Sequence, residues 1–517
     1  MYFCTHKRIK TMGNWKRNAL IAIWAALLTG CQQVQVPTSF ADVNKAPQIY
    51  PDYRDVTIPV NIAPLTFEWD GACDEMVARF SAGQQELVCG GGKVQPDMDD
   101  WRRLLSGAAG KAIDVEVYAM HDGRWNRYRP FRIMVSKDSI DPYISYRLIS
   151  PSYVTYEELT LNQRCLENYD ETVMVDNMLC STENDGQCVN CHNYQNYNPE
   201  RMQFHARQAH GGTVLVYDGK VRKINMRNDS LISAGVYPAW HPWLPLIVYS
   251  TNHTSQSFHT QHPNKIEVFD SASDLIAYDV ERNEVTSLEN DTTEFEVFPC
   301  WAPDGKTLYY CSAHFEFKDS IDHDVEIVSR AKEIRYDIYK KSFNPDTYEF
   351  GARELVFSAD SLGKSATLPR VSPDGRFLMF TLGNYGVFHI WHHEADLCLM
   401  DLQTGSVRAL DELNSPDTES YHSWSSNGRW VIFSSRRDDG GYTRPFMAHM
   451  DANGKGSKPF ELPQADPDYH SQFVKSYNIP EFMRGPVKVS PQAFARVLKD
   501  SDGEPVKYVG GLRPSEE

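Results

Sequence analysis

Residues 298–313, FPCWAPDGKTLYYCSA, determine the fold of this 517-residue chain. The segment begins as a short apolar run, turns at Pro303-Asp304-Gly305 and continues as a run of alternating apolar residues. A glycine that follows an aspartate supplies the positive φ that tight hairpin turns require. The pattern therefore predicts two antiparallel strands joined by a tight turn.

The same pattern recurs three more times in the second half of the chain. The copies are YPAWHPWLPLIVYSTN at 237–252, LPRVSPDGRFLMFTLG at 368–383 and YHSWSSNGRWVIFSSR at 421–436. Each copy is followed by a second predicted hairpin, most clearly at 274–288 and 396–410. Two hairpins per repeat form a four-stranded sheet, which is one blade of a β-propeller.

This repeat resembles the TolB-like β-propeller family, whose blades carry a Trp-x-Pro-Asp-Gly-Lys/Arg turn. The resemblance covers roughly residues 210–465. It implies an all-β fold with a TolB-like propeller of about six blades, five or seven being the alternatives. We expect the propeller at 213–465, with residues 144–180 able to supply a further blade.

The two ends of the chain lack the blade turn. Residues 52–150 contain short alternating apolar runs and one expected helix near 97–105, which indicates a small β-rich N-terminal module. Residues 466–517 form a tail, in which PQAFARVLKD at 491–500 predicts a short helix.

Residues 1–30 read as an export signal that ends in a lipoprotein-type cleavage site. Basic residues precede the apolar run 19–28, which is too short to span a bilayer. Leu28-Thr29-Gly30-Cys31 resembles the bacterial lipobox, which implies that Cys31 carries the lipid anchor. We expect a protein anchored on the periplasmic side of the outer membrane, with residues 31–51 as its tether. The alternative is a soluble secreted protein.

The charge of the chain argues against nucleic acid as a partner. The sequence has 52 Lys and Arg against 69 Asp and Glu, a formal net charge of -17. Binding to phosphates needs clustered basic side chains, and an acidic surface repels them.

Cys188-Val189-Asn190-Cys191-His192 has the pattern of a covalent haem c site. In that chemistry both thiols, here those of Cys188 and Cys191, form thioethers to the porphyrin. His192 would then bind the iron from the proximal face. Export supports this reading, because c-type haem is attached outside the cytoplasm. A disulfide and a zinc site are the alternatives, and we expect residues 151–212 to form a haem-binding segment that leads into the propeller.

A six-coordinate haem also needs a distal ligand. Met202 and His205 follow Pro199 at a spacing that predicts one face of a helix, so either could approach the iron. His259 is a weaker candidate, and His210 is weaker still. An iron with no distal ligand would instead indicate small-ligand binding or catalysis.

Nine cysteines remain after Cys4 and Cys31 are set aside, and an oxidising compartment favours their pairing. Cys73 with Cys89 and Cys165 with Cys180 are the local pairs that the spacing suggests, although spacing alone proves no link.

Three functions follow from these features. The first is an envelope-anchored monohaem c-type cytochrome that transfers single electrons, or senses through its haem, with a redox partner. The second is a non-redox TolB-like envelope scaffold that binds a protein or a glycan. The third is a haem enzyme with an open iron site. No Gly-x-Ser-x-Gly nucleophile elbow occurs, so a serine hydrolase is not indicated.

Overall fold

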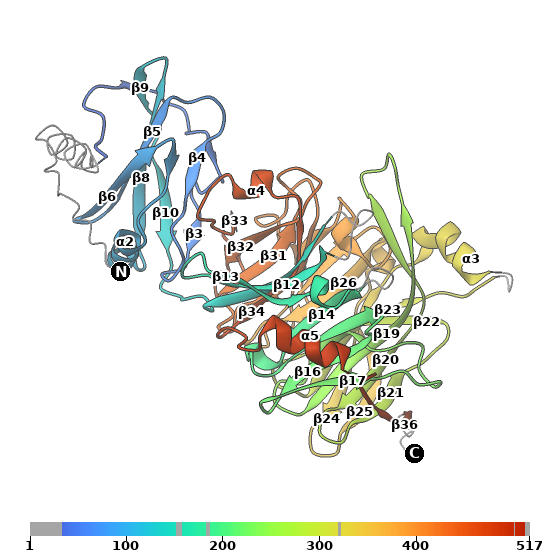
Figure 1. Ribbon diagram of the computed structural model, residues 1–517. Coiled ribbons are helices and arrows are strands. Elements are labelled where there is room, and N and C mark those ends of the chain that lie inside the picture. The colour runs from blue at the N-terminus through green and yellow to red at the C-terminus, as the bar shows by residue number, and fades with distance from the viewer. Residues whose placement is uncertain (1–33, 151–157, 182–186, 319–321, 501, 512–517) are drawn as a thin grey trace, which may run out of the picture.

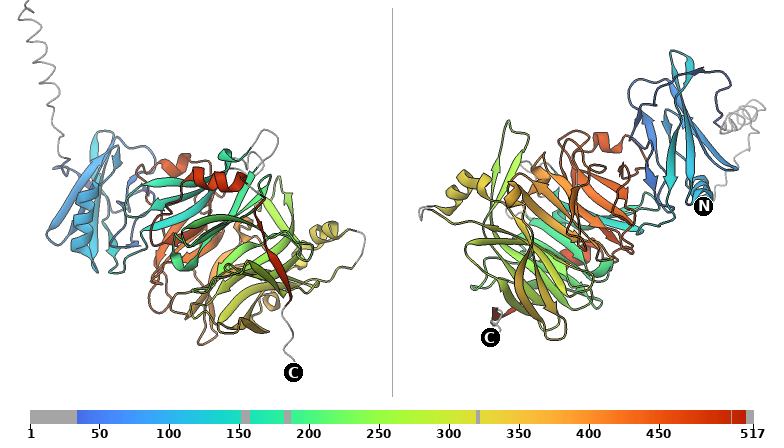
Figure 2. Two further views of the ribbon diagram at one scale, coloured as in Figure 1. Left: turned by 60° about the horizontal axis from the view of Figure 1, so that its bottom comes forward. Right: turned by 180° about the vertical axis from the view of Figure 1, so that it is seen from behind.

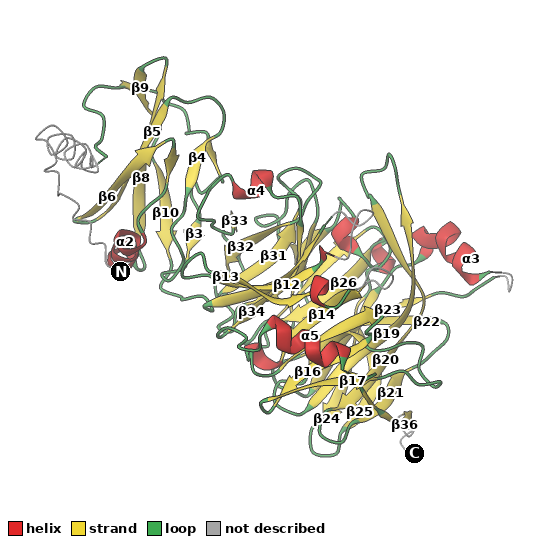
Figure 3. Ribbon diagram, viewed as in Figure 1, coloured by secondary structure: helices red, strands yellow, loops and turns green. Residues whose placement is uncertain are grey.

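The computed structural model describes residues 34–150, 158–181, 187–318, 322–500 and 502–511. The expected signal and Cys31 lie outside these residues. Strands dominate the fold, with a few short helices at its surface (Figure 3). This confirms the all-β class. No helix in the described part of the chain is both long enough and apolar enough to span a membrane.

The main body is a ring of blades around a central channel, and the described residues form six of them (Figure 1). In five blades the strands follow one another along the chain, from the channel outwards. Blade 1 contains β14 (Gln187–Tyr194), β15 (Met202–Gln208), β16 (Gly212–Tyr217) and β17 (Lys220–Asn225). Blade 2 contains β18 (Val236–Trp240), β19 (Leu246–Phe258), β20 (Ile266–Asp279) and β21 (Glu284–Glu289).

The next three blades have the same order of strands. Blade 3 contains β22 (Glu294–Trp301), β23 (Thr307–His314), β24 (Asp337–Asn344) and β25 (Glu349–Phe357). Blade 4 contains β26 (Ser365–Val371), β27 (Phe377–Gly383), β28 (Asp396–Asp401) and β29 (Val407–Ala409). Blade 5 contains β30 (Glu419–Trp424), β31 (Trp430–Ser435), β32 (Arg444–His449) and β33 (Phe460–Glu461).

The sixth blade joins the two ends of the ring. Its inner strand, β34 (Ser476–Met483), comes from the tail and pairs with β11 (Tyr143–Ile149), which continues into β12 (Thr160–Cys165) and β13 (Glu171–Asp176). The sixth blade therefore combines strands from the N-terminal and C-terminal parts of the ring, and the hydrogen bonds between β34 and β11 close the ring. The ring thus extends beyond 213–465 in both directions.

The N-terminal module packs against blades 5 and 6, at one side of the ring (Figure 2). Its larger sheet contains β1 (Ala41–Asp42), β9 (Arg124–Arg127), β8 (Ala112–His121), β10 (Phe131–Val135), β3 (Thr57–Ile58), β5 (Glu75–Ala82) and β6 (Gln85–Gly91). A small sheet contains β2 (Ile49–Tyr50), β4 (Phe67–Trp69) and β7 (Lys93–Val94). Helix α2 (Met98–Ala108) is capped by Asp97 and buries Trp101. One apolar cluster runs from this module to Trp430, which joins the two parts.

The remaining helices and edge strands lie outside the blades. Helix α5 (Pro491–Lys499) is capped by Ser490 and buries Phe494 between blades 6 and 1. Strands β35 (Glu504–Pro505) and β36 (Lys507–Gly511) extend the outer edges of blades 1 and 2. Helices α3 (His323–Arg330) and α4 (Tyr469–Gln472) lie in loops.

Two expectations about local structure are wrong. Residues 202–208 form a strand and not a helix, because they pair on both sides with β14 and β16. The described cysteines form no disulfide. Cys165 faces Tyr143 across a strand pair, whereas the Cys180 sulfur contacts the carbonyl of Ala495 at 3.9 Å.

Candidate functional site

Each inner strand contains one bulged residue in the left-handed region, at the same place in every blade. These residues are Cys191, Tyr237, Phe298, Leu368, Tyr421 and Ile479, with φ between 46° and 56°. Each lies where the pairing of its blade shifts register. The residues that follow them are His192, Pro238, Pro299, Pro369, His422 and Pro480. Cys191-His192 is therefore the blade 1 copy of a bulge that recurs around the ring.

The six bulged residues meet at the centre of the channel and close it. Together they line a cavity of only about 40 Å³. Cys191 has the smallest side chain among them, and it is 4% exposed. The channel is therefore not a continuous pore, and each of its two mouths is a blind depression.

The arrangement around Cys191 and His192 does not fit a haem. Cofactor pockets have volumes of about 300–1,000 Å³, far more than the cavity that these two residues line. Cys188 lies in the extended part of β14, where it faces Arg207 of β15. A haem attached to both thiols would have to displace the channel wall.

His192 is nevertheless an unusual side chain. It is 1% exposed, and neither ring nitrogen makes a hydrogen bond of regular geometry within the described residues. Burial, and then the charge of Arg147, lower the pKa of His192 to about 3, although the nearby backbone of Ser145 and Ile479 partly offsets this shift. The imidazole is therefore neutral in the folded protein at neutral pH.

The proposed distal ligands lie on different sides of the ring wall. Met202 is fully buried in the apolar cluster between blades 1 and 6. His205 lies three residues further along the same strand and so points to the opposite face, where Nδ1 is 3.1 Å from the hydroxyl of Thr213. His259 follows β19 at the end of a long hairpin, and His210 lies in the turn after β15.

Within the described ranges, no group of three or more His, Cys, Asp and Glu has the arrangement of a metal site.

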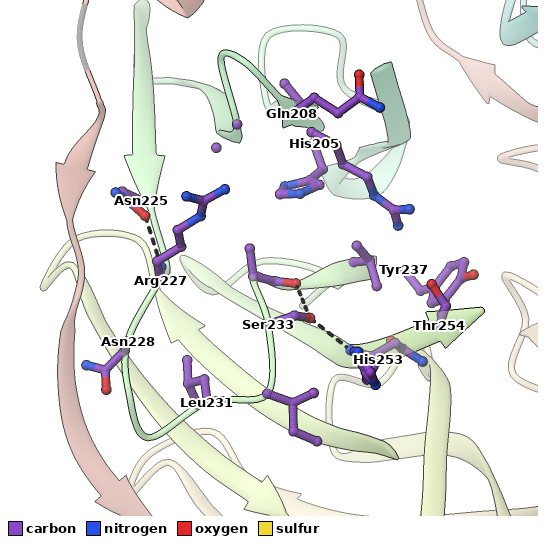
Figure 4. Close-up of a pocket in the computed structure, with 18 of the residues that line it drawn as sticks. His205, Gln208, Asn225, Arg227, Asn228, Leu231, Ser233, Tyr237, His253 and Thr254 are labelled. Carbon is purple, nitrogen blue, oxygen red and sulfur yellow. Dashed lines mark hydrogen bonds between the residues drawn. The ribbon is translucent and has the colours of Figure 1, made fainter. Parts of the chain in front are cut away.

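The upper mouth, on the side where the inner strands begin, contains a pocket of about 630 Å³ between blades 1 and 2. Figure 4 shows the Arg227 side chain directed towards the His205 ring across this pocket. Arg207 also lines it, and Tyr237 of the constriction forms part of its floor. Burial, and then the charges of Arg207 and Arg227, lower the pKa of His205 to about 3. The guanidinium groups of Arg207 and Arg227 therefore both place positive charge at this one pocket.

Long insertions surround this same mouth. The β19–β20 hairpin extends beyond the ring and carries Glu267, whose carboxylate accepts hydrogen bonds from His392 at 2.9 Å and Tyr385 at 2.7 Å. Both partners come from the β27–β28 loop of blade 4. Burial raises the pKa of Glu267, but the hydrogen bonds from His392 and Tyr385, together with the charges of His392 and His259, outweigh burial and lower the pKa. Glu267 thus fastens the hairpin to blade 4.

The lower mouth is aromatic and contains a pocket of about 420 Å³. Its walls include Trp240, Trp301 and Trp424, one from each of three blades. Arg370 and Glu481 form an ion pair of 2.8 Å across it. The tryptophans follow the bulges by three residues, so this mouth is built from the repeat itself.

Sequence reasoning missed that Cys191-His192 is part of a blade. The signal was present, because Cys191-His192-Asn193-Tyr194 matches Tyr421-His422-Ser423-Trp424 in the position of its histidine and its aromatic residue. The basic upper pocket had no comparable signal, since its residues come from separate strands and loops.

No family model matches the chain, and no curated protein matches it. Among solved structures, it is similar to TolB from Acinetobacter baumannii, with 14% identity over 75% of this chain and 85% of that chain, at a TM-score of 0.40. Hydrazine synthase from Kuenenia stuttgartiensis is 11% identical over 64% of this chain and 48% of that chain, with a TM-score of 0.39. The β-propeller domain of the Trilobed protease from Pyrococcus furiosus is 12% identical over 66% and 79%, with a TM-score of 0.26. These likenesses concern the fold alone, and none of them assigns an activity. The strand order itself shows a β-propeller, and TolB is among the proteins with a similar chain path.

Proposed function

We propose that this chain is a non-enzymatic binding scaffold of the cell envelope, which holds a partner at the upper mouth of its propeller. The observation that carries the proposal is the closed constriction of six bulged residues. Because the constriction blocks the channel, a partner that enters the upper mouth does not pass through to the lower one and contacts the side chains of a rigid ring.

The placement of the insertions supports the upper mouth as the binding side. The β19–β20 hairpin, α3 and the β27–β28 loop all leave the ring at the end where the inner strands begin. They lengthen the repeat beyond what a four-stranded blade needs. Binding residues are concentrated on loops that a rigid framework positions, so elaboration of one mouth favours that mouth for recognition.

Location in the envelope rests on the sequence. The lipobox-like Leu28-Thr29-Gly30-Cys31 favours a lipid anchor on the periplasmic side of the outer membrane. A Cys31→Ser variant should appear in the soluble envelope fraction, whereas the unaltered protein should sediment with membranes. Equal sedimentation of both proteins would contradict the anchor and leave the binding proposal standing.

Site-specific cross-linking in intact cells tests the binding role. A photo-reactive residue at Thr254, in the wall of the upper mouth, should yield a discrete cross-linked product. The same residue at Lys220, at the β16–β17 turn on the opposite end of blade 1, serves as the control. Equal products from both positions, or no product from Thr254, would refute the scaffold role at this mouth.

A c-type cytochrome is the second candidate. It is favoured by the spacing of Cys188 and Cys191, and by the ring nitrogens of His192, which make no hydrogen bond of regular geometry within the described residues. The haem would supply one-electron chemistry, and β14 would have to leave the channel wall to receive it. Protein produced in a host with the cytochrome c assembly machinery should then give a pyridine haemochrome spectrum. Absence of that spectrum would end this candidate.

A further inference from the structure

We propose that the pocket between blades 1 and 2 is a binding site for a small organic oxyanion, held by Arg207 and Arg227. This inference rests on the proposed scaffold function and names the class of ligand that the upper mouth takes. Guanidinium groups bind phosphate and carboxylate through paired, charge-assisted hydrogen bonds. Two guanidinium groups that line one pocket of an otherwise acidic protein therefore indicate a site for such an anion.

The two arginines reach the pocket from different parts of blade 1. Arg207 is half-buried near the end of β15, and Arg227 follows β17. Arg227 makes no side-chain hydrogen bond or ion pair with the described residues, and Figure 4 shows it directed into the pocket. A Cβ atom built at Gly211, in the turn after β15, would lie 3.4 Å from a terminal nitrogen of Arg227. The missing side chain at Gly211 therefore leaves space beside the guanidinium group.

The neutral groups of the pocket complete an anion site. His205 is buried, with Nδ1 3.1 Å from the hydroxyl of Thr213. In the tautomer in which Nδ1 accepts from that hydroxyl, the neutral ring carries its proton on Nε2 and donates it to the anion. Asn225, Asn228 and Gln208 add amide groups to the wall. Asp229 is the one acidic side chain among the described residues that line the pocket. Arg207, Arg227 and Asp229 together contribute a formal charge of +1 to the pocket wall, whereas the whole chain has a formal net charge of -17.

The volume indicates more than a bare inorganic ion. About 630 Å³ lies within the range of about 300–1,000 Å³ that is usual for small-molecule sites. The amides can accept and donate hydrogen bonds to hydroxyl groups, so the preferred ligand is a hydroxylated molecule that carries a phosphate or a carboxylate. Tyr237 lines both this pocket and the small cavity at the centre of the channel, so it separates the two spaces.

Three probes of one carbon skeleton test the proposal: glycerol 3-phosphate, glycerate and glycerol. Isothermal titration calorimetry on the folded protein should detect binding of glycerol 3-phosphate, of glycerate, or of both, and not of glycerol. The stronger of the first two identifies phosphate or carboxylate as the anion. Binding should weaken as salt is added. No heat from either anion, or glycerol binding as tightly as the anions, would overturn the proposal.

Charge variants show whether the binding is at this pocket. Arg227→Gln should weaken anion binding about tenfold, because it removes one charge-assisted contact. Arg227→Lys should restore only part of it, because lysine keeps the charge but lacks the planar fork. Lys220→Gln removes the same charge at the opposite end of the blade and should leave binding unchanged. Equal weakening by Arg227→Gln and Lys220→Gln would overturn the assignment to this pocket.

The calorimetric and cross-linking results are independent. If the anions fail to bind while Thr254 still cross-links, the scaffold stands and the oxyanion site is refuted. If the anions bind through Arg227 while Thr254 gives no product, the scaffold role is refuted and the pocket remains an anion site. Circular dichroism of each variant establishes that it is folded before binding is compared.

Discussion

Cys191 and Tyr237 hold the same position in neighbouring blades. Both have a positive φ, of 52° and 47°, both lie at a register shift of an inner strand, and both face the closed centre of the channel. The residue after the cysteine is His192, and the residue after the tyrosine is Pro238. Cys188–His192, which has the spacing of a haem site, is thus also part of the inner strand of blade 1. Substitutions in it can test whether its role is structural.

The double variant Cys188→Ala/Cys191→Ala should fold and keep its stability within about 1 kcal/mol. The substitution removes two sulfur atoms, and the adjoining cavity is small already. Thermal unfolding of both proteins, produced in a host without cytochrome c assembly, measures the difference. Failure of the unaltered protein to fold in that host would show that the motif needs its haem.

His192→Pro should preserve the fold and reduce the sensitivity of the protein to acid. Proline already follows a bulged residue at Pro238 and Pro299, so the backbone accepts it. The pKa of His192 is about 3 when folded and about 6.5 when unfolded, so the unfolded state binds the extra proton. The wild type therefore loses stability as pH falls from about 6.5 towards 3, by up to about 1.4 kcal/mol per pH unit from this residue.

Urea unfolding at pH 7 and pH 5 measures that effect. The stability lost between the two values should be smaller in His192→Pro than in the wild type. His262→Ala, which changes an exposed histidine, is the matched control and should behave as the wild type does. An unchanged loss in His192→Pro would contradict a buried, neutral His192.

Glu296→Gln should stabilise the protein, and increasingly so at alkaline pH. The carboxyl is fully buried with no hydrogen bond among the described residues. Burial, together with Glu289 and Asp274, raises its pKa to about 9. A raised carboxyl pKa means that stability is lost as pH rises from about 4.5 to 9. The advantage of the variant should therefore grow by about 1.4 kcal/mol per pH unit in that range.

Denaturation at pH 6 and pH 8 checks this prediction. Glu294→Gln is the contrast in the same strand, because Glu294 accepts a hydrogen bond from Ser312 at 2.7 Å and lies 3.4 Å from Arg353. It should be destabilising at both pH values. A loss of stability in Glu296→Gln at pH 8 would refute the assignment of a costly buried acid.

Glu267→Ala should release the β19–β20 hairpin from blade 4. Loss of the carboxylate leaves His392 buried without its 2.9 Å partner, and breaking a buried pair costs about 3–5 kcal/mol. Limited proteolysis should then cut within residues 253–265. His259→Ala, at a partly exposed site 3.7 Å from the same carboxylate, should have little effect. Equal protection of the hairpin in both variants would contradict the fastening role of Glu267.

The repeat in the sequence is sufficient to predict the propeller and its all-β class. The Pro-Asp-Gly turn at 303–305 acts locally: the glycine has the positive φ that the turn needs, 58°, and the repeat copies that requirement around the ring. A second local match, between Cys191-His192 and Tyr421-His422, was also visible in the sequence but has too few residues in common to outweigh the haem pattern.

The residues that surround Cys188–His192 follow from the three-dimensional fold and not from the local sequence. Pairing of β14 with β15 makes Met202 and His205 face opposite sides, and closure of the ring by β34 brings Ile479 against Cys191. The upper pocket depends on the packing of blade 2 against blade 1, because Arg207 and Arg227 of blade 1 share its wall with Tyr237 of blade 2. Such contacts join residues far apart in the chain, and local patterns of hydrophobicity carry no record of them.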